Sequence, residues 1–321
     1  MNNIQRKIVC KCKNIIRRNK SLHSVYLYPP VQGGWEKIDY PIVGKDSELV
    51  LFDPYVYKYL GSYVMYVSCR NSGGILRFES VDGMNWDNGI EVLSKRSYNG
   101  WENIVNRAYV LKHGDSHYMW YTGQTANTSC IGLATSIDGK LFNRISDTPV
   151  IVPDNHFEKA SVMNPSVIWD DELKKFRMWY SAGEIYEPDV ICYAESTDGI
   201  AWVKYEEGPV FSKGDKPYDH YKVGGCDVHY VNGRYIMYYI GYETLDNARI
   251  CVAKSDDGIH NWIRSSENPI ISPSKGGWDS HACYKPSVVY DKDIIRLWYN
   301  GRKKRIEKIG IATKKVQFES L

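Results

Sequence analysis

Short runs of aromatic and branched residues, separated by clusters of Gly, Asp and Asn, follow one another along most of the chain. Such side chains suit a pleated, half-buried surface, so each run is predicted to be a β-strand. One run, of the type Met-Trp-Tyr-Ser, occurs five times, at 65–68, 119–122, 178–181, 237–240 and 297–300. Successive starts lie 54, 59, 59 and 60 residues apart. A near-constant period of this size indicates repeated units that cannot bury their own faces alone.

A second phrase, Ser-x-Asp-Gly followed by a large aromatic residue, occurs four times. It starts at Ser80, Ser136, Ser196 and Ser255, and these starts lie 56, 60 and 59 residues apart. Asp and Gly tolerate positive φ, so each phrase predicts a tight hairpin. In the third unit, segments 164–169, 175–180, 190–195 and 202–210 are predicted to be four strands. Four antiparallel strands per unit form the blade of a propeller.

The two ends of the chain complement each other. The fifth unit ends near residues 309–313 without the turn phrase or a fourth strand. Residues 33–43 match the stretch 199–210, which runs from the turn glycine through the fourth strand of the third unit. An N-terminal strand that completes the last blade would close the ring and cover an exposed sheet edge. The sequence therefore predicts an all-β fold over residues 25–321, a five-bladed β-propeller of four-stranded antiparallel blades closed by an N-terminal strand.

Residues 1–24 form a separate basic segment. Residues 1–20 hold seven Lys and Arg and no acidic residue, and their apolar residues recur at helical spacing. We expect a short amphipathic helix that either packs over the propeller or contacts an anionic membrane or an acidic partner. Without these seven, 34 of the 41 basic residues remain against 38 acidic ones, so the body is acidic and nucleic acid is not expected as a partner.

Cysteine and histidine usage favours a cytoplasmic protein without a metal. The eight cysteines include no CxxC pair, and no secretory signal pattern precedes them, so reduced structural thiols and a cytoplasmic location are expected. No paired His motif of the metalloenzyme type occurs, and the histidines that precede inner strands differ in their offsets. We therefore expect neither a metal nor a cofactor.

Chemistry is expected where the repeated units differ. The innermost strand of each blade lines the central channel, and five such strands align on a shared valine. The first aligned position holds five different residues, which are Asp53, Arg107, Asn164, Gly225 and Lys285. Two residues further on, facing the same way, the fourth unit has Asp227. Residues that recur in every unit, such as the acidic residues of Trp101-Glu102 and its counterparts, are expected to be structural.

The repeats, the Asp-Pro pair that opens the first inner strand, the aromatic second strands and the Ser-x-Asp-Gly turns together resemble the five-bladed propeller glycosidase superfamily. That group includes β-xylosidase and arabinanase-like, invertase-like and β-mannoside phosphorylase-like families, and the likeness covers residues 25–318. The resemblance implies an enzyme that acts on a glycosidic bond with paired carboxylates at the propeller axis. It gives Asp53 the role of general base or nucleophile, offers Glu184 or Glu243 as general acid, and offers Asp227 as the third carboxylate.

Cationic and aromatic side chains complete the candidate site. Arginine and lysine would hold a carboxylate, sulfate or phosphate by charge-assisted hydrogen bonds, and aromatic rings would stack on a sugar. The substrate-binding candidates are Arg70, Arg107, Asn164, Lys285, Arg302, Tyr55, Tyr109, Trp101, Trp278 and His281. Hydrolysis, phosphorolysis and transfer stay open as reactions, as does inversion or retention. A propeller that binds glycan without chemistry is the alternative.

Overall fold

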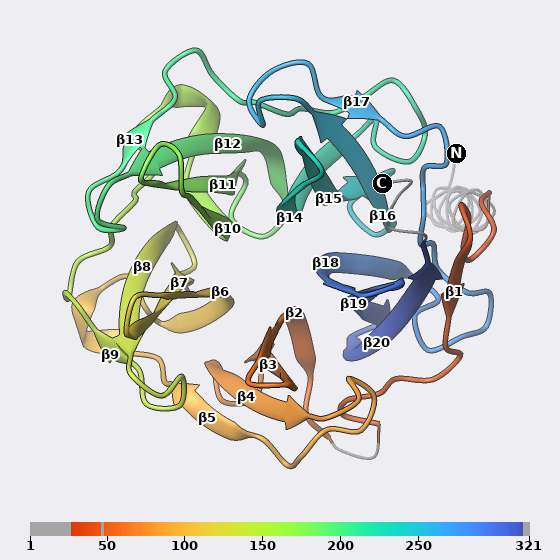
Figure 1. Ribbon diagram of the computed structural model, residues 1–321, viewed down its shortest axis with the longest axis horizontal. Helices are drawn as coiled ribbons and strands as arrows, with labels where there is room; N and C mark the ends of the chain where they lie inside the picture. Colours follow the sequence, from red (N-terminus) through yellow and green to blue (C-terminus); the bar gives the residue numbers. More distant parts are fainter. Residues whose placement is uncertain (1–26, 46–47, 317–321) are drawn as a thin grey trace, which may run out of the picture.

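The computed structural model describes residues 27–45 and 48–316, and nearly all regular structure in them is β-strand. The basic segment 1–24, with its predicted helix, lies outside the described residues. The strands form groups arranged around a central axis, and the chain passes from one group to the next around the ring (Figure 1). None of the helices in the described ranges is long and apolar enough to cross a membrane.

The strands are β1 (Trp35–Lys37), β2 (Leu51–Tyr59), β3 (Ser62–Cys69), β4 (Gly74–Ser80), β5 (Ile90–Leu93), β6 (Ile104–His113), β7 (Ser116–Gln124), β8 (Ser129–Ser136), β9 (Asn143–Arg144), β10 (Ser161–Asp170), β11 (Lys175–Gly183), β12 (Pro188–Ser196), β13 (Val203–Lys204), β14 (Lys222–Val231), β15 (Arg234–Tyr242), β16 (Ala248–Ser255), β17 (Ile263–Arg264), β18 (Ala282–Asp291), β19 (Ile294–Lys303) and β20 (Ile306–Lys315). Two 3-10 turns, η1 (Ser97–Asn99) and η2 (His156–Glu158), precede β6 and β10.

Hairpins in chain order build the sheets, which confirms the predicted all-β antiparallel architecture. Strands β2 to β5 form one four-stranded sheet and β14 to β17 form another. Strands β6 to β9 and β10 to β13 repeat this order, and a single bridge between Ser129 and Ser161 joins them. The last sheet has the order β1-β20-β19-β18, in which Trp35 pairs with Lys314 and Lys37 with Ala312. The first described strand thus lies beside the last.

The Ser-x-Asp-Gly phrase forms the turn that ends β4, β8, β12 and β16, the third strands of the first four units. In the first copy, Ser80 Oγ donates to Asp82 Oδ1 at 2.9 Å, and the same oxygen accepts the N–H groups of Met84 and Asn85, each at 2.8 Å. Gly83 has a φ of +73°, which the absence of a Cβ makes accessible. Asp therefore caps the turn and Gly provides its conformation.

Each of these turns also docks onto the neighbouring sheet. Trp120 Nε1 donates to Gly199 O at 3.0 Å, and a Cβ on Gly199 would lie only 2.9 Å from Trp120 Cζ2. The same contact recurs from Trp179 to Gly258, from Tyr66 to Gly139 and from Trp298 to Gly83. The last of these links the final sheet to the first, so the repeated aromatic run and the repeated turn form one interface.

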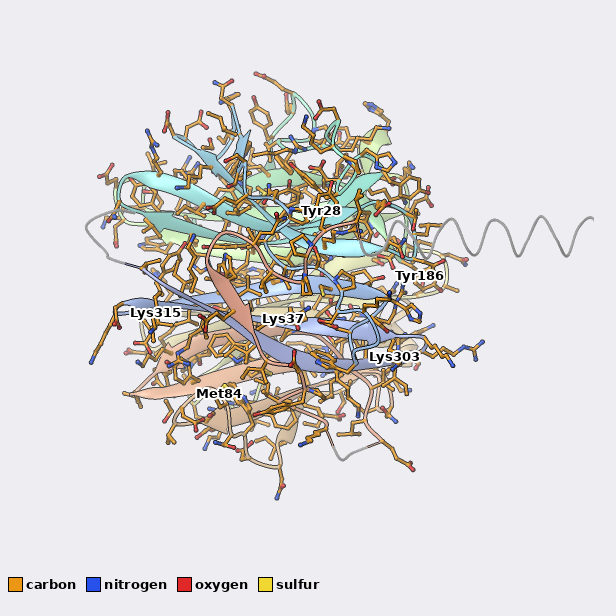
Figure 2. All side chains as sticks on the ribbon, turned by 90° about the vertical axis from the view of Figure 1, so that its right-hand side faces the viewer. Tyr28, Lys37, Met84, Tyr186, Lys303 and Lys315 are labelled. Atoms are coloured by element: carbon orange, nitrogen blue, oxygen red, sulfur yellow. The ribbon has the colours of Figure 1, made fainter. Side chains whose placement is uncertain are left out.

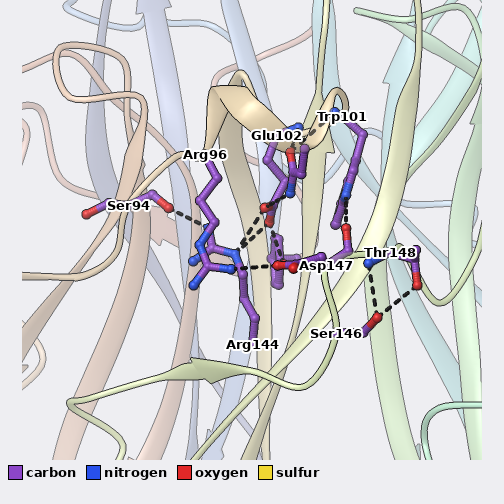
Figure 3. A network of polar contacts seen from close by, with 10 residues as sticks. Ser94, Arg96, Trp101, Glu102, Arg144, Ser146, Asp147 and Thr148 are labelled. Atoms are coloured by element: carbon purple, nitrogen blue, oxygen red, sulfur yellow. Dashed lines mark hydrogen bonds and ion pairs between the residues drawn. The ribbon is translucent and has the colours of Figure 1, made fainter.

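A buried carboxylate network recurs at the outer edge of four sheets. Glu102 is fully buried and accepts hydrogen bonds from Arg144 Nε, at 2.8 and 3.1 Å, and from Tyr121 Oη at 2.5 Å (Figure 3). The equivalent sets are Glu158, Lys204 and Tyr180; Asp219, Arg264 and Tyr239; and Asp279, Lys37 and Tyr299. Because Lys37 of β1 takes the place that Arg144 holds in β9, β1 serves as an outer strand of the last sheet.

The cysteines of the described part are packing residues. Cys69, Cys130, Cys192, Cys226, Cys251 and Cys283 are all buried and carry free thiols. Burial raises the pKa of the Cys192 and Cys251 thiols, which opposes the reactive thiolate form. These positions behave as small apolar residues in the strands.

Candidate functional site

A polar cavity of about 240 Å³ lies among the inner strands. It is lined by Phe52, Asp53, Arg70, Ile104, Asn106, Arg107, Gln124, Asn164, Tyr186, Glu187, Ile240, Tyr242, Tyr284, Asn300, Arg302 and Glu307. Tyr186 of this set and Lys303, which follows Arg302, lie on one face of the molecule, whereas Met84 and Lys315 lie toward the other (Figure 2). The Ser-x-Asp-Gly turn that contains Met84 is thus at the end away from the cavity.

A β-bulge in each inner strand sets the positions aligned in the sequence. The register of β2 shifts between Phe52 and Tyr55, and the other inner strands shift at the equivalent place. The aligned residues all have positive φ, with values of 51° at Asp53, 56° at Arg107, 53° at Asn164, 52° at Gly225 and 36° at Lys285. Non-glycine residues seldom adopt this region, and each costs about 1–3 kcal/mol. Strain of this kind is typical of functional sites.

The neighbouring sheet holds four of the five bulges in place through the last residue of the Met-Trp-Tyr-Ser run. Arg107 N–H donates to Ser68 Oγ at 2.8 Å, and Asp53 N–H donates to Asn300 Oδ1 at 3.2 Å. Asn164 and Gly225 make the same bond to Thr122 and Ser181. The polar end of the aromatic run therefore positions the backbone of the residues that face the channel.

Asp53 and Arg107 meet across the cavity wall. Arg107 Nε lies 3.1 Å from Asp53 Oδ2, and the side chains are only 11% and 10% exposed. The Arg107 guanidinium also donates to Gln124 Oε1 and Asn106 Oδ1, each at 3.2 Å. Since three acceptors hold one guanidinium, the Asp53 carboxylate faces the cavity in a fixed ion pair.

Glu187, which is not among the predicted site residues, is the second carboxyl group of the cavity. Burial raises its pKa to about 7, against the lowering effect of a hydrogen bond from Tyr242 and of the charges on Arg107 and Arg302. The negative charge of Asp53 raises the pKa of Glu187 further, so the two carboxyl groups interact electrostatically. Lys222 Nζ donates to the Glu187 backbone carbonyl at 2.9 Å and fixes this segment.

Glu307 is a third carboxyl group of the cavity, also absent from the predicted set. Arg70 Nη2 lies 3.0 Å from Glu307 Oε2. Burial raises the pKa of Glu307, and Arg70 opposes that shift. The cavity therefore combines three carboxyl groups with Arg70, Arg107 and Arg302.

The other predicted carboxylates lie away from the cavity, for identifiable reasons. Asp227 is 1% exposed and accepts the Val288 N–H at 2.6 Å, so it joins two inner strands. Glu243 Oε2 lies 2.7 Å from the buried Arg249. Glu184 is 58% exposed and pairs with Lys159 at 2.9 Å. None of these three candidates lines the cavity, which corrects their expected place beside Asp53.

The predicted binding residues divide in the same way. Arg70, Arg107, Asn164 and Arg302 line the cavity. The remaining six serve packing or internal hydrogen bonds: Tyr55 donates to Val110 O and packs on Tyr109, Trp101 donates to Asp147 O (Figure 3), Trp278 stacks on Tyr299, His281 accepts the Lys304 N–H, and Lys285 Nζ donates to Cys226 O. The cavity instead presents Tyr186, Tyr242 and Tyr284.

One signal for the missed carboxylate is visible in the sequence. Residues 184–189, which form the connection after β11 and the start of β12, read Glu-Ile-Tyr-Glu-Pro-Asp, a run that no other unit repeats. Loops that differ between repeats are where function concentrates. A search of such loops, as well as of the inner strands, would have selected Glu187 and Tyr186.

Comparison with known proteins agrees with this description. Residues 106–223 match the family model of the glycosyl hydrolases family 32 N-terminal domain. An uncharacterised Mycobacterium tuberculosis protein, Rv1502, is 28% identical over 210 residues, which are 61% of this chain and 67% of that protein.

Solved structures with a similar fold include proteins described as glycoside hydrolases. A structure described as a BT0996 RGII complex has a TM-score of 0.73 at 19% identity, with 92% of this chain and 95% of the other covered. A thermostable family-43 glycoside hydrolase has a TM-score of 0.66 at 20% identity, with 82% and 88% covered. A GH130 structure, from a family of mannoside phosphorylases that contains glycoside hydrolases targeting β-1,2 mannosidic linkages in Candida mannan, has a TM-score of 0.65 at 17% identity, with 89% and 90% covered. Together the family match and the shared fold confirm the resemblance of the chain to the propeller glycosidase superfamily.

Proposed function

We propose that the chain is a closed five-bladed propeller enzyme that cleaves a glycosidic bond, with Asp53 and Glu187 as its working carboxyl groups. One observation carries this proposal: the same cavity contains a carboxylate paired with Arg107 at 3.1 Å and a second carboxyl group whose pKa burial raises to about 7. Two carboxyl groups in unlike environments are what glycoside cleavage requires, one to give a proton and one ionised.

The roles follow from the environments. Glu187 keeps its proton near neutral pH and would donate it to the departing glycosidic oxygen. Asp53 would then either activate a water or attack the anomeric carbon directly. Tyr242, which hydrogen-bonds Glu187, would hold the acid in position. The pairing of β1 with β20 supports ring closure, and the free buried cysteines fit a reducing compartment such as the cytoplasm.

Aryl glycosides with leaving groups of different acidity test both roles. Asp53→Asn should lower kcat by about 10²-fold or more on every substrate while binding is kept. Glu187→Gln should affect substrates with poor leaving groups strongly and a dinitrophenyl glycoside little, because an acidic leaving group needs no proton. Glu184→Gln, three residues earlier and outside the cavity, is the matched control. Assays with and without phosphate separate hydrolysis from phosphorolysis.

If both Asp53→Asn and Glu187→Gln keep full activity, the proposal is wrong. Tight glycan binding by wild-type protein that never leads to cleavage, across a broad panel of linkages, would favour a non-catalytic glycan-binding propeller instead. The two outcomes differ in the readout, since binding is measured by calorimetry and cleavage by product release.

A further inference from the structure

The three arginines of the cavity are not equally paired. Arg107 has Asp53 as its partner and Arg70 has Glu307. Arg302 instead donates through Nη2 to the Asp246 backbone carbonyl at 2.8 Å, and the Asp246 carboxylate, 3.5 Å away, is 92% exposed. Within the described residues, the buried Nε of Arg302 has no hydrogen-bond partner. In the described structure, Arg302 is therefore the cavity arginine without a buried carboxylate in ion-pair contact.

Two further polar atoms of the cavity residues are buried without a partner in the described structure. Tyr284 is 6% exposed and its hydroxyl makes no hydrogen bond. Asn164 is 4% exposed and its Oδ1 accepts none. The Arg302 guanidinium lies over the Tyr284 ring, 5.1 Å from its centroid, so the two groups are adjacent. Leaving a buried polar group unpaired costs about 1–3 kcal/mol, which a bound ligand would recover.

We propose that Arg302 and Tyr284 form a subsite for an oxyanion carried by the substrate, so that the protein acts on an anionic glycan. Both groups can donate hydrogen bonds to a carboxylate, sulfate or phosphate, and a bond from a guanidinium to such an oxygen is among the strong ones. Asn164 Oδ1 accepts a sugar hydroxyl of the same substrate. This inference rests on the proposed function, whose substrate class it specifies.

The surface beside the subsite extends the same charge. Lys303, Lys304 and Arg305 follow Arg302 directly, and all three are exposed. Lys303 lies on the face that carries Tyr186 of the cavity (Figure 2). A basic run that starts in the cavity and continues at its mouth suits a chain with anionic groups on neighbouring sugars better than a single free ion. Free phosphate has the same oxyanion chemistry, so the experiment includes it as a separate arm.

The test measures binding in the Glu187→Gln background, in which cleavage of oligosaccharides, whose leaving groups are poor, is expected to be strongly slowed. An array of uronate-, sulfate- and phosphate-bearing oligosaccharides is screened beside the neutral parent of each, and hits are titrated by calorimetry. We expect an anionic member to bind about 10- to 100-fold more tightly than its parent. Arg302→Met should abolish that preference, and Tyr284→Phe should reduce it. Arg234→Gln, which removes an exposed arginine at the opposite end of β14 and β15, should leave it unchanged.

The outcomes separate this inference from the proposed function. Equal binding of anionic and neutral members, no anionic hit at all, or an Arg302→Met variant that weakens both members equally would overturn the anionic subsite while leaving cleavage of neutral aryl glycosides untouched. Binding of inorganic phosphate alone, together with phosphate-dependent cleavage of neutral sugars, would overturn the proposal that the bound oxyanion is a substituent of the substrate. If Arg302→Met fails to fold, Tyr284→Phe and the salt dependence of wild-type binding decide the question, since the preference must shrink at high ionic strength.

Discussion

Replacement of Glu187 by Gln should stabilise the protein at alkaline pH and not at acid pH. A pKa raised from 4.5 to about 7 corresponds to about 3 kcal/mol at most. The side chain is partly exposed to the cavity, so the measurable part is about 1–2 kcal/mol. The sign follows from linkage. Between pH 4.5 and about pH 7, the folded state holds a proton on Glu187 that the unfolded state releases. Wild-type stability therefore falls as the pH rises through that window. Gln does not titrate and keeps an oxygen that can accept from Tyr242.

Denaturant unfolding of both proteins at pH 5 and pH 8 measures this difference. The variant should gain about 1–2 kcal/mol relative to wild type between the two pH values. In parallel, wild-type kcat/KM should fall above pH 7 as Glu187 loses its proton, and that limb should vanish from the residual activity of the variant. Glu184→Gln controls for the loss of one acidic residue in the same loop. A difference that is the same at both pH values, or larger at pH 5, would refute the argument that burial keeps Glu187 protonated.

Two further predictions concern the framework. Gly199→Ala should lower the free energy of unfolding by about 1–3 kcal/mol more than Gly233→Ala, because the φ values are +77° and +80° but only the Cβ at 199 meets Trp120, at 2.9 Å. Urea unfolding of the pair compares them, and equal losses would argue against the turn as a docking element. Glu102→Gln leaves the buried Arg144 without its carboxylate and should cost about 3 kcal/mol by thermal unfolding. A loss below about 1 kcal/mol would mean that the network contributes little.

The strands and turns were predictable because the units repeat the same strand-forming and turn-forming residues at equivalent positions. Asp82 and its counterparts had to cap turns, and an aromatic run had to pack against something in every unit. The basic residue at the end of β9, β13 and β17, two positions after an aromatic residue, reappears as Lys37 in β1. The match between residues 33–43 and a fourth strand therefore also agrees with the contact between Lys37 and Asp279. Because the same pattern recurs in several units, these features could be predicted from the sequence.

The site was only partly predictable, because the cavity is not built from the inner strands alone. Alignment of those strands found Asp53, Arg107 and Asn164, which line the cavity. Glu187 and Glu307 come from the connection before β12 and from the start of β20, where the repeats share no pattern. Residues 184 and 187 stand three positions apart in one loop, yet the first pairs with Lys159 outside the cavity and the second enters it. Only the path of the backbone distinguishes them.

The junction between the fourth and fifth units shows why unlike residues at equivalent positions need not all be ligand contacts. Ile240 stands where the other units have Ser, Thr or Asn, so it cannot accept a bond from the next bulge. A Cβ on Gly225 would lie 2.4 Å from Ile240 Cδ1, and Lys285 instead turns its buried ammonium to the Cys226 carbonyl. Packing against Ile240 therefore accounts for Gly225 and an internal hydrogen bond accounts for Lys285, so two of the five aligned residues need no ligand. It also gives the cavity an apolar wall at Ile240, opposite in character to the Asp53 and Arg107 pair, and a sugar presents the same contrast between its ring face and its hydroxyls.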